Sequence, residues 1–323
     1  MKGIKSFSIF ILVFLLFLLG KEAYSAPFAV VANEFDRTIN TIDLGTGPPT
    51  VFGPFLGGQL GGSGLLQDVA TTPDGNFALV GNRGIQTVFL IDVSDPTNPT
   101  LADSVNIGLG SSFQEIDIAI ASNGQFALAI GGIGDQIGNQ IAIINLATFT
   151  LTTTYTLTTP NAGAGCIAIA PDNQTVIVCD TFNNRIIFGS INPGSGLTSE
   201  TTLAAGNTPI NAAISPDGQT VLVANFADFF FGIPDDTVSV FRITGPGMVV
   251  AGTPPTVSGL PGFQQSIAFS PDGDRAYVVS VPPSPSQLSE LLINGPGDVS
   301  LGPGVADLLS VFNGGFFGSM LLP

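Results

Sequence analysis

The sequence predicts an all-β protein, a β-propeller of about six four-stranded antiparallel blades, with seven blades as the alternative. The first observation is a repeated unit of apolar strand, tight turn and apolar strand that ends at a small or polar residue. The second is the regular spacing of this unit along the chain: the residues at which successive units end are 49, 49, 49, 45 and 55 positions apart. The third is that no helical periodicity follows residue 25. The end residues are Asn33, Asn82, Gly131, Asp180, Asn225 and Ser280.

The turn within each unit has a sequence that favours a hairpin. The full form reads Ser215-Pro216-Asp217-Gly218. Proline presets φ at the first corner, Asp or Asn suits the second, and Gly accepts the left-handed position that follows. Short runs rich in Val, Ile and Ala flank the turn, as expected of buried strands. One copy, Ala121-Ser122-Asn123-Gly124, lacks the proline.

Further strands complete each predicted blade. A third apolar run follows each hairpin, and Thr-rich runs at residues 151–157 and 201–203 predict a fourth strand. The first copy, residues 28–44, begins at the second strand of its unit, so its inner strand is missing. Residues 305–312 have the pattern of that strand. We therefore expect the N- and C-terminal strands to share a blade and close the ring.

The seven-blade alternative uses the same C-terminal region differently. Residues 308–312 and 316–322 would then form a hairpin of their own, joined by Asn313-Gly314-Gly315. A solenoid is less favoured, since its terminal repeats need dedicated caps.

The N-terminus has the pattern of a secretory signal peptide. Lys2 and Lys5 precede an apolar run at residues 7–20, and Ala23-Tyr24-Ser25 offers small residues for cleavage. The run is shorter than the ~20 residues of a membrane-spanning helix, and no second such run follows. The sequence thus predicts a signal peptide at 1–25, a single propeller domain at 26–323, and a secreted or periplasmic location without a stable membrane span.

Composition excludes several classes of function. The net charge is −16, and removal of the signal peptide makes it −18, so nucleic acid is not an expected partner. The chain has no His, which excludes Ser-His-Asp and Cys-His catalysis and histidine-ligated metals. It also has no Trp. No catalytic constellation is recognisable, and the sequence favours a protein that is not an enzyme.

Two cysteines, Cys166 and Cys179, lie on either side of the Pro171-Asp172-Asn173 turn. An exported protein with two cysteines favours a disulfide. If the turn has two central residues, the cysteines lie directly opposite each other across the hairpin. If a bulge shifts the pairing by one, they point to opposite faces and remain two buried thiols.

One polar position recurs at the start of the predicted inner strands, which line the central channel of a propeller. Three residues at this position, Asp68, Asp117 and Asn211, carry side-chain oxygen atoms of the kind that bind Ca²⁺, and they are the candidate metal ligands. No other cofactor is predicted. The alternative is that these side chains bind backbone groups or water at the channel mouth. The residues at this position are Asp68, Asp117, Cys166, Asn211 and Ser266.

An insertion after Asn225 lengthens one repeat. Its three consecutive Phe residues cannot all face inward on a strand, so as a loop they would expose an apolar patch rimmed by acids, typical of an interaction surface. The alternative is that the loop folds back over a blade edge. The candidate interaction residues are Phe229, Phe230, Phe231, Asp235 and Asp236.

The unit from Ser215 to Asn225, followed by Thr237-Val238-Ser239-Val240-Phe241, resembles the YVTN-type β-propeller repeat of the lactonase-like propellers. The resemblance covers nearly the whole chain after residue 25 and implies the propeller fold. It also implies kinship with lactonases of the 6-phosphogluconolactonase type, which use Glu, Arg and His. Because this chain has no His, we do not expect that activity to carry over.

The sequence therefore favours an exported, non-enzymatic propeller that serves as a scaffold for binding a protein or a small molecule. The alternative is a lactonase-like hydrolase of a sugar lactone that uses the channel carboxylates Asp68 and Asp117, with or without a cation.

Overall fold

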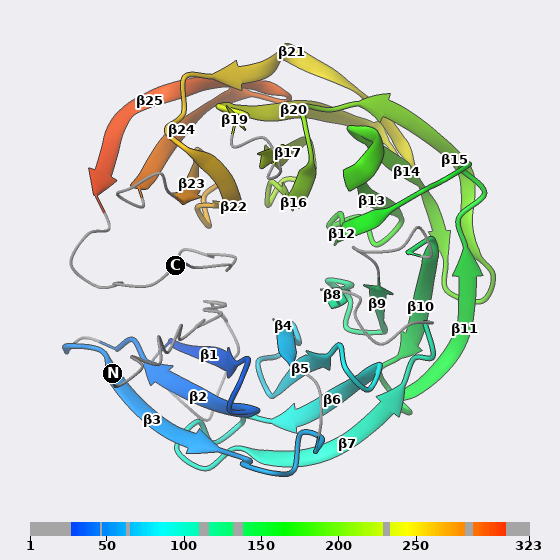
Figure 1. The fold of residues 1–323 in the computed structure, drawn as a ribbon, viewed down its shortest axis with the longest axis vertical. Coiled ribbons are helices and arrows are strands. Elements are labelled where there is room, and N and C mark those ends of the chain that lie inside the picture. The colour runs from blue at the N-terminus through cyan, green and yellow to red at the C-terminus, as the bar shows by residue number, and fades with distance from the viewer. Residues whose placement is uncertain are drawn as a thin grey trace, which may run out of the picture.

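The computed structural model describes residues 27–45, 47–62, 65–109, 116–131, 138–228, 233–281 and 287–307. It confirms the β-propeller: six antiparallel sheets stand around a common axis (Figure 1). Five sheets have four strands, and the first has three. The only helical element in these residues is one 3-10 turn at Thr181–Asn183.

The first three blades follow one another along the chain. Each is a simple meander in which every strand pairs with the next one in sequence, and the first strand lies innermost. Blade 1 has β1 (Phe28–Asn33), β2 (Thr38–Asp43) and β3 (Thr50–Phe55). Blade 2 has β4 (Leu66–Thr71), β5 (Phe77–Asn82), β6 (Thr87–Asp92) and β7 (Thr100–Asn106). Blade 3 has β8 (Ile116–Ile120), β9 (Phe126–Gly131), β10 (Gln140–Asn145) and β11 (Thr150–Thr156).

The next three blades repeat this plan with longer outer strands. Blade 4 has β12 (Ala164–Ile169), β13 (Thr175–Asp180), β14 (Arg185–Asn192) and β15 (Gly196–Ala204). Blade 5 has β16 (Pro209–Ile214), β17 (Thr220–Asn225), β20 (Thr237–Gly245) and β21 (Met248–Ser258). Blade 6 has β22 (Phe263–Phe269), β23 (Arg275–Val281), β24 (Gln287–Gly295) and β25 (Asp298–Asp307).

The hydrophobic core lies between neighbouring blades. One cluster joins Leu128 and Ile141 of blade 3 to Val176 and Ile187 of blade 4, and all four side chains are fully buried. Because both faces of the sheets of blades 2 to 5 are covered by neighbouring blades, their middle strands are apolar on both faces. This explains the runs of Val, Ile and Ala in the repeat, which show no alternation with polar residues.

The hairpin turns form as the residue pattern predicts. In the Ser215–Gly218 copy, the Gly218 N–H donates to the Ser215 carbonyl at 2.8 Å, and Gly218 has φ of 72°. Asp217 accepts from the Gln219 N–H at 2.9 Å through its carboxylate. These contacts set the register in which Ile214 pairs with Val221.

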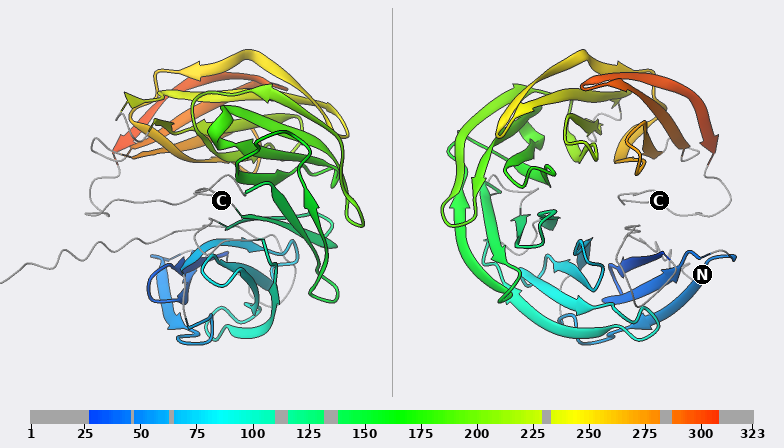
Figure 2. Two further views of the ribbon diagram at one scale, coloured as in Figure 1. Left: turned by 45° about the vertical axis from the view of Figure 1, so that its right-hand side comes forward. Right: turned by 180° about the vertical axis from the view of Figure 1, so that it is seen from behind.

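The predicted closure of the ring falls mostly outside the described residues. Residues 305–307 do not join blade 1 but extend β25, where Val305 pairs with Ser289. The reason is the length of the β24–β25 hairpin, which continues the pairing of blade 6 up to Asp307. Residues 308–323 lie outside the description. The ribbon of described residues forms an arc that is open between β22 and β1 (Figures 1 and 2).

The insertion after Asn225 forms a small two-stranded ribbon of its own, β18 (Ala227–Asp228) with β19 (Ile233–Pro234). Phe229, Phe230 and Phe231 lie outside the described residues. Within the described parts of the chain, we find no helix that is both apolar and long enough to cross a membrane.

Candidate functional site

The recurring polar position at the inner strands links neighbouring blades. The Asp68 carboxylate of β4 accepts a hydrogen bond from the Ile118 N–H of β8 at 2.5 Å. The Asp117 carboxylate of β8 accepts one from the Ile167 N–H of β12 at 2.6 Å. Each bond runs from one inner strand to a backbone N–H of the next. These acids therefore hold adjacent blades together, which is the second of the two roles that the sequence left open.

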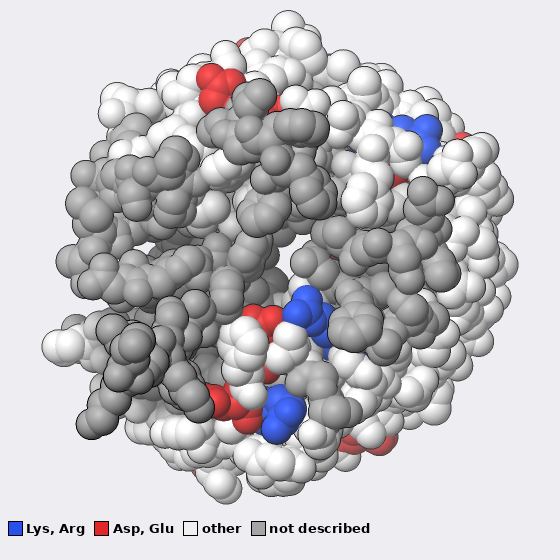
Figure 3. Space-filling model, in the orientation of Figure 1, with Lys and Arg blue, Asp and Glu red and all other residues white. Residues whose placement is uncertain are grey.

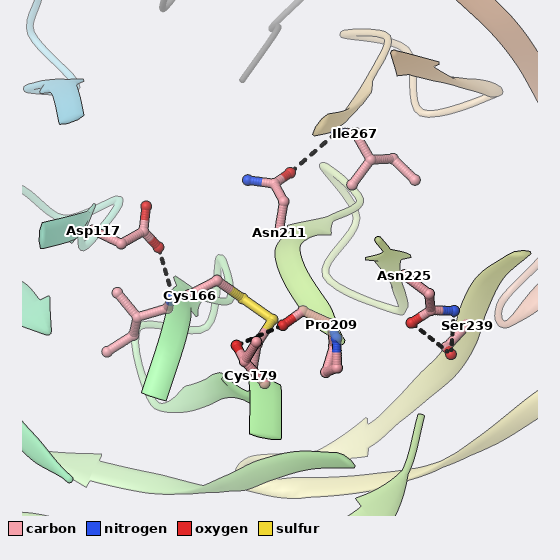
Figure 4. Close-up of a disulfide and its surroundings, with 10 residues drawn as sticks. Asp117, Cys166, Cys179, Pro209, Asn211, Asn225, Ser239 and Ile267 are labelled. Carbon is pink, nitrogen blue, oxygen red and sulfur yellow. Dashed lines mark hydrogen bonds between the residues drawn. A yellow bond between two sulfur atoms is a disulfide. The ribbon is translucent and has the colours of Figure 1, made fainter. Parts of the chain in front are cut away.

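Asn211 makes the same kind of bond on the far side of the channel. Its Oδ1 accepts from the Ile267 N–H of β22 at 3.0 Å (Figure 4). An amide oxygen thus replaces a carboxylate at an equivalent position. The bond at this position therefore needs an acceptor and does not need a charge.

The disulfide occupies the place between Asp117 and Asn211 in this series. Cys166 and Cys179 are bonded, with their Cα atoms 4.9 Å apart, and they pair directly opposite each other in the β12–β13 register. The bulge of this hairpin lies between Ala164 and Cys166, before the cysteine, so the register of the pair is unshifted. Cys166 lies between Asp117 and Asn211 in Figure 4, but its sulfur is bonded within its own blade.

The two neighbouring acids are electrostatically unequal. Burial raises the pKa of Asp68 well above its usual value, and the negative charge of Asp117 raises it further. The N–H donors of Ile118 and Val69 act in the opposite direction. Asp68 is only 2% exposed, whereas Asp117 is half-buried. The proton-bound form of Asp68 is therefore favoured relative to an ordinary aspartate.

The calcium site expected at Asp68, Asp117 and Asn211 stays a prediction. In the parts of the chain that are described, no three His, Cys, Asp or Glu side chains lie close enough together to hold a metal ion. The carboxylates of Asp68 and Asp117 and the amide oxygen of Asn211 instead each accept a backbone N–H.

The loops at one end of the blades form the second candidate region, here called the loop face. It comprises the described connections from second to third strands, at residues 34–37, 83–86, 181–184, 226–228 and 233–236, and the described parts of the connections from outer strands to the next blade. Figure 3 shows basic and acidic side chains beside one another on this face. One ion pair crosses between blades 1 and 2, from Arg83 to Glu34 at 3.3 Å.

Several acids of the loop face are used to position loops. Asp180 is fully buried. Its carboxylate forms an ion pair with the Arg185 Nε at 2.6 Å and accepts a hydrogen bond from the Gly163 N–H at 2.9 Å. Asp235, one of the predicted interaction residues, accepts the Asn207 N–H at 2.7 Å. Asp236 is exposed. The end of the insertion is thus fixed to the neighbouring loop through Asp235.

Two aromatic rings are exposed at matching places on the loop face. Phe35 and Phe182 each lie two residues after the end residue of a second strand, and they are 47% and 54% exposed. A Cβ on Gly163 would lie 2.5 Å from the Phe182 Cδ2, so the ring rests against the Gly163 backbone. By contrast, Phe226 at the start of the insertion is buried and stacks on Phe263 at 5.1 Å. The sequence reasoning missed Phe35 and Phe182, although their shared place in the repeat was a usable signal.

Many solved structures have similar folds, among them the following two. One is a functionally unknown protein from Desulfotomaculum acetoxidans DSM 771, with a TM-score of 0.70 and 19% identity, covering 87% of this chain and 80% of that one. The other is the hydrazine synthase of Kuenenia stuttgartiensis, with a TM-score of 0.64 and 15% identity, covering 91% of this chain and 79% of that one. At these identities the likeness concerns the fold alone. No curated protein matches the sequence.

A protein-family model matches residues 68–245, which is more than half of the chain. The matched region begins at Asp68 in β4 and ends in β20, so it includes the acceptors Asp68, Asp117 and Asn211 and both cysteines of the disulfide. This match agrees with the propeller architecture and with the resemblance of the repeat. The chain belongs to the family described as lactonase, 7-bladed beta-propeller.

Proposed function

We propose that this protein is an exported, non-enzymatic propeller that binds a protein partner through its loop face. The observation that carries the proposal is the exposure of Phe35 and Phe182 at equivalent places on that face. Exposed aromatic rings on an otherwise polar surface are typical of binding sites, because they offer a large contact area with little loss of side-chain freedom.

The chemistry of the channel supports the same proposal. The carboxylates that would serve a hydrolase already accept backbone hydrogen bonds, and Asp68 is almost completely buried. A group engaged in this way is poorly placed to reach a substrate. The acidic character of the chain favours a partner whose surface is apolar with basic residues at its rim.

The experiment uses the mature chain as bait in an extract of the exported fraction of its source. We compare the parent with a Phe35→Ser/Phe182→Ser variant and with a Met248→Ser/Val250→Ser control. Met248 and Val250 are exposed on the outer strand β21, at 62% and 44%, so the control removes similar apolar surface away from the loop face. The proposal expects one partner to be retained by parent and control and lost by the loop-face variant. The same proteins on all three baits would contradict it.

Hydrolysis of a sugar lactone is the second candidate, favoured by family membership and by the unequal acid pair. In a hydrolase, Asp68 with its raised pKa beside the second carboxyl group of Asp117 would be suited to acid–base work, with or without a bound Ca²⁺. Turnover of a sugar lactone by the parent, its loss in Asp117→Asn, and a calcium-dependent rise in melting temperature would support this candidate. Absence of turnover and of any calcium effect would remove it.

A further inference from the structure

The exposed ring of Phe182 lies among amide side chains on the loop face of blade 4. Three connections meet around it, at residues 157–163, 181–184 and 205–208. The ring is 54% exposed. This surface thus combines an open aromatic ring with several amides, and its exposed asparagines are Asn161, Asn183, Asn184 and Asn207.

Hydrogen bonds fix the three connections to one another. The Asn183 Nδ2 donates to the Asn161 carbonyl at 2.8 Å. The Thr208 N–H donates to the Asn184 Oδ1 at 2.8 Å. Because these loops are already held in place, they lose little conformational freedom when a ligand binds.

The Phe182 ring is supported by the backbone at Gly163. A Cβ on Gly163 would lie 2.5 Å from the Phe182 Cδ2 and 3.4 Å from its Cγ and Cε2, so a larger residue there would displace the ring. The rest of the ring is open, and the face of an aromatic ring carries partial negative charge. Such a supported ring suits the packing of C–H groups, which carry partial positive charge.

Two acids beside this surface are already engaged. The Asp180 carboxylate binds the Arg185 Nε at 2.6 Å, and the Asp235 carboxylate accepts the Asn207 N–H at 2.7 Å. The exposed amides both donate and accept hydrogen bonds, as hydroxyl groups require of a partner. They also cost less to desolvate than carboxylates. The surface therefore suits an uncharged ligand that is rich in hydroxyl groups.

Phe35 of blade 1 offers a comparison within the same chain, because it holds the equivalent place in the repeat and is 47% exposed. The two residues that follow it are Asp36 and Arg37, where blade 4 has Asn183 and Asn184. Arg37 and Asn184 share the left-handed conformation, with φ of 54° and 53°, which confirms the alignment. Two similar rings are thus followed by charged residues in blade 1 and by amides in blade 4.

We propose that the surface around Phe182 binds a neutral oligosaccharide of pyranose units. The C–H face of one sugar ring packs on Phe182, and the hydroxyl groups exchange hydrogen bonds with the amides of Asn161 and Asn207. The net charge of −16 disfavours an anionic saccharide. This binding depends on Phe182 and not on Phe35, so it does not rest on the protein binding proposed above, to which both rings contribute.

Titration calorimetry on the purified mature chain tests the proposal without any protein partner. The probes are cellohexaose, laminarihexaose, maltohexaose, mannohexaose and chitohexaose, with hexagalacturonate as the anionic comparison. At least one neutral probe should bind the parent. Phe182→Ser should weaken that binding at least about tenfold. Gly163→Ala, which displaces the ring without removing it, and Asn161→Asp, which replaces a donor by a charge, should each weaken it at least about threefold.

Two variants serve as matched controls and should leave the affinity unchanged. Phe35→Ser removes the equivalent ring of blade 1. Asn145→Asp makes the same amide change at an exposed position at the opposite end of the blades, where the Oδ1 that accepts the Ala147 N–H is kept. A urea midpoint for each variant establishes that it is folded.

The proposal is overturned if no neutral probe binds the parent, or if binding survives Phe182→Ser. It is also overturned if Phe35→Ser weakens binding as much as Phe182→Ser, or if hexagalacturonate binds more tightly than every neutral probe. Binding of a neutral hexasaccharide that is lost in Phe182→Ser and kept in both controls supports it. That result stands whether or not the bait experiment recovers a protein partner, so the two proposals can fail separately.

Discussion

The Ser122 Oγ lies 3.0 Å from the Asn173 Oδ1, so two departures from the repeat contact each other across neighbouring blades. The Asn123 N–H donates to the same oxygen at 3.0 Å. Regular copies instead place a proline against a glycine, as where Pro216 Cδ lies 3.3 Å from the Cβ position of Gly273. The turn that lacks proline, at residues 121–124, is thus followed in the next blade by the turn that lacks glycine, at residues 170–173. A hydrogen bond between turns replaces a close packing contact.

A double-mutant cycle should detect this compensation. Ser122→Ala and Asn173→Gly both remove the hydrogen bond, so their effects on the free energy of unfolding should not add. We expect a coupling of about 0.5–1 kcal/mol, the range for a partly exposed hydrogen bond. Urea unfolding measures it. A second cycle of Ser122→Ala with the distant Asn294→Ala should be additive, and additivity in both cycles would contradict the compensation.

The raised pKa of Asp68 should make stability depend on pH. Its raised pKa means that the folded state holds a proton that the unfolded state has released. This contribution is complete below the ordinary pKa of Asp and is lost as the pH rises through the raised value. The stability of the parent minus that of Asp68→Asn should therefore fall with rising pH, by at most about 1.4 kcal/mol per pH unit. A constant or rising difference between about pH 4 and pH 8 would refute the assignment.

Asp68→Asn and Asp68→Ala should differ in their effects. Asn keeps an acceptor for the Ile118 N–H, as Asn211 does for Ile267, whereas Ala leaves that buried N–H unpaired. We expect Ala to be about 1–3 kcal/mol less stable than Asn at one pH. Equal stability of the two variants would show that the inter-blade bond is unimportant.

Glu200 links blades 3 and 4 and should stabilise the protein at neutral pH. Burial acts to raise its pKa, but hydrogen bonds from Thr159 and Thr158 outweigh burial and lower the pKa below its ordinary value. The Tyr155 hydroxyl also donates to it, at 3.0 Å. This contribution is present above the ordinary pKa of Glu and is lost as the pH falls through the lowered value. Stability relative to Glu200→Gln should decline on acidification, measured by urea unfolding. A relative stability that rises towards acid pH would contradict the account.

The disulfide lies where other blades have an inter-blade hydrogen bond, so the stability that each provides at this position can be compared. Removing it with Cys166→Ala/Cys179→Ala should cost about 2–4 kcal/mol of unfolding free energy. Cys166→Asn/Cys179→Ala should recover part of this loss, because Asn at this position can accept the Ala212 N–H as Asn211 accepts that of Ile267. Peptide mass mapping with and without reductant establishes the bond itself. A variant with Asn that is no more stable than the one with Ala would argue against an inter-blade bond here.

The repeat was sufficient to predict the blades, since hairpin turn, strand lengths and period are local properties. It could not decide the roles of Asp68 and Asp117, because their donors, Ile118 and Ile167, lie on other blades about 50 residues away. The pairing of Cys166 with Cys179 depended on the absence of a bulge between Cys166 and the turn, and the turn sequence does not show that the bulge lies before Cys166 instead. The exposure of Phe182 depends on the neighbouring loop at Gly163, which periodicity does not describe.

The dissociation constant of the partner recovered by the parent chain tests the central claim most directly. Titration calorimetry should compare the parent, Phe35→Ser/Phe182→Ser and the Met248→Ser/Val250→Ser control, each shown to be folded by its urea midpoint. The account predicts affinity at least about tenfold weaker for the loop-face variant and unchanged for the control. Equal affinity of all three proteins would contradict binding through the loop face.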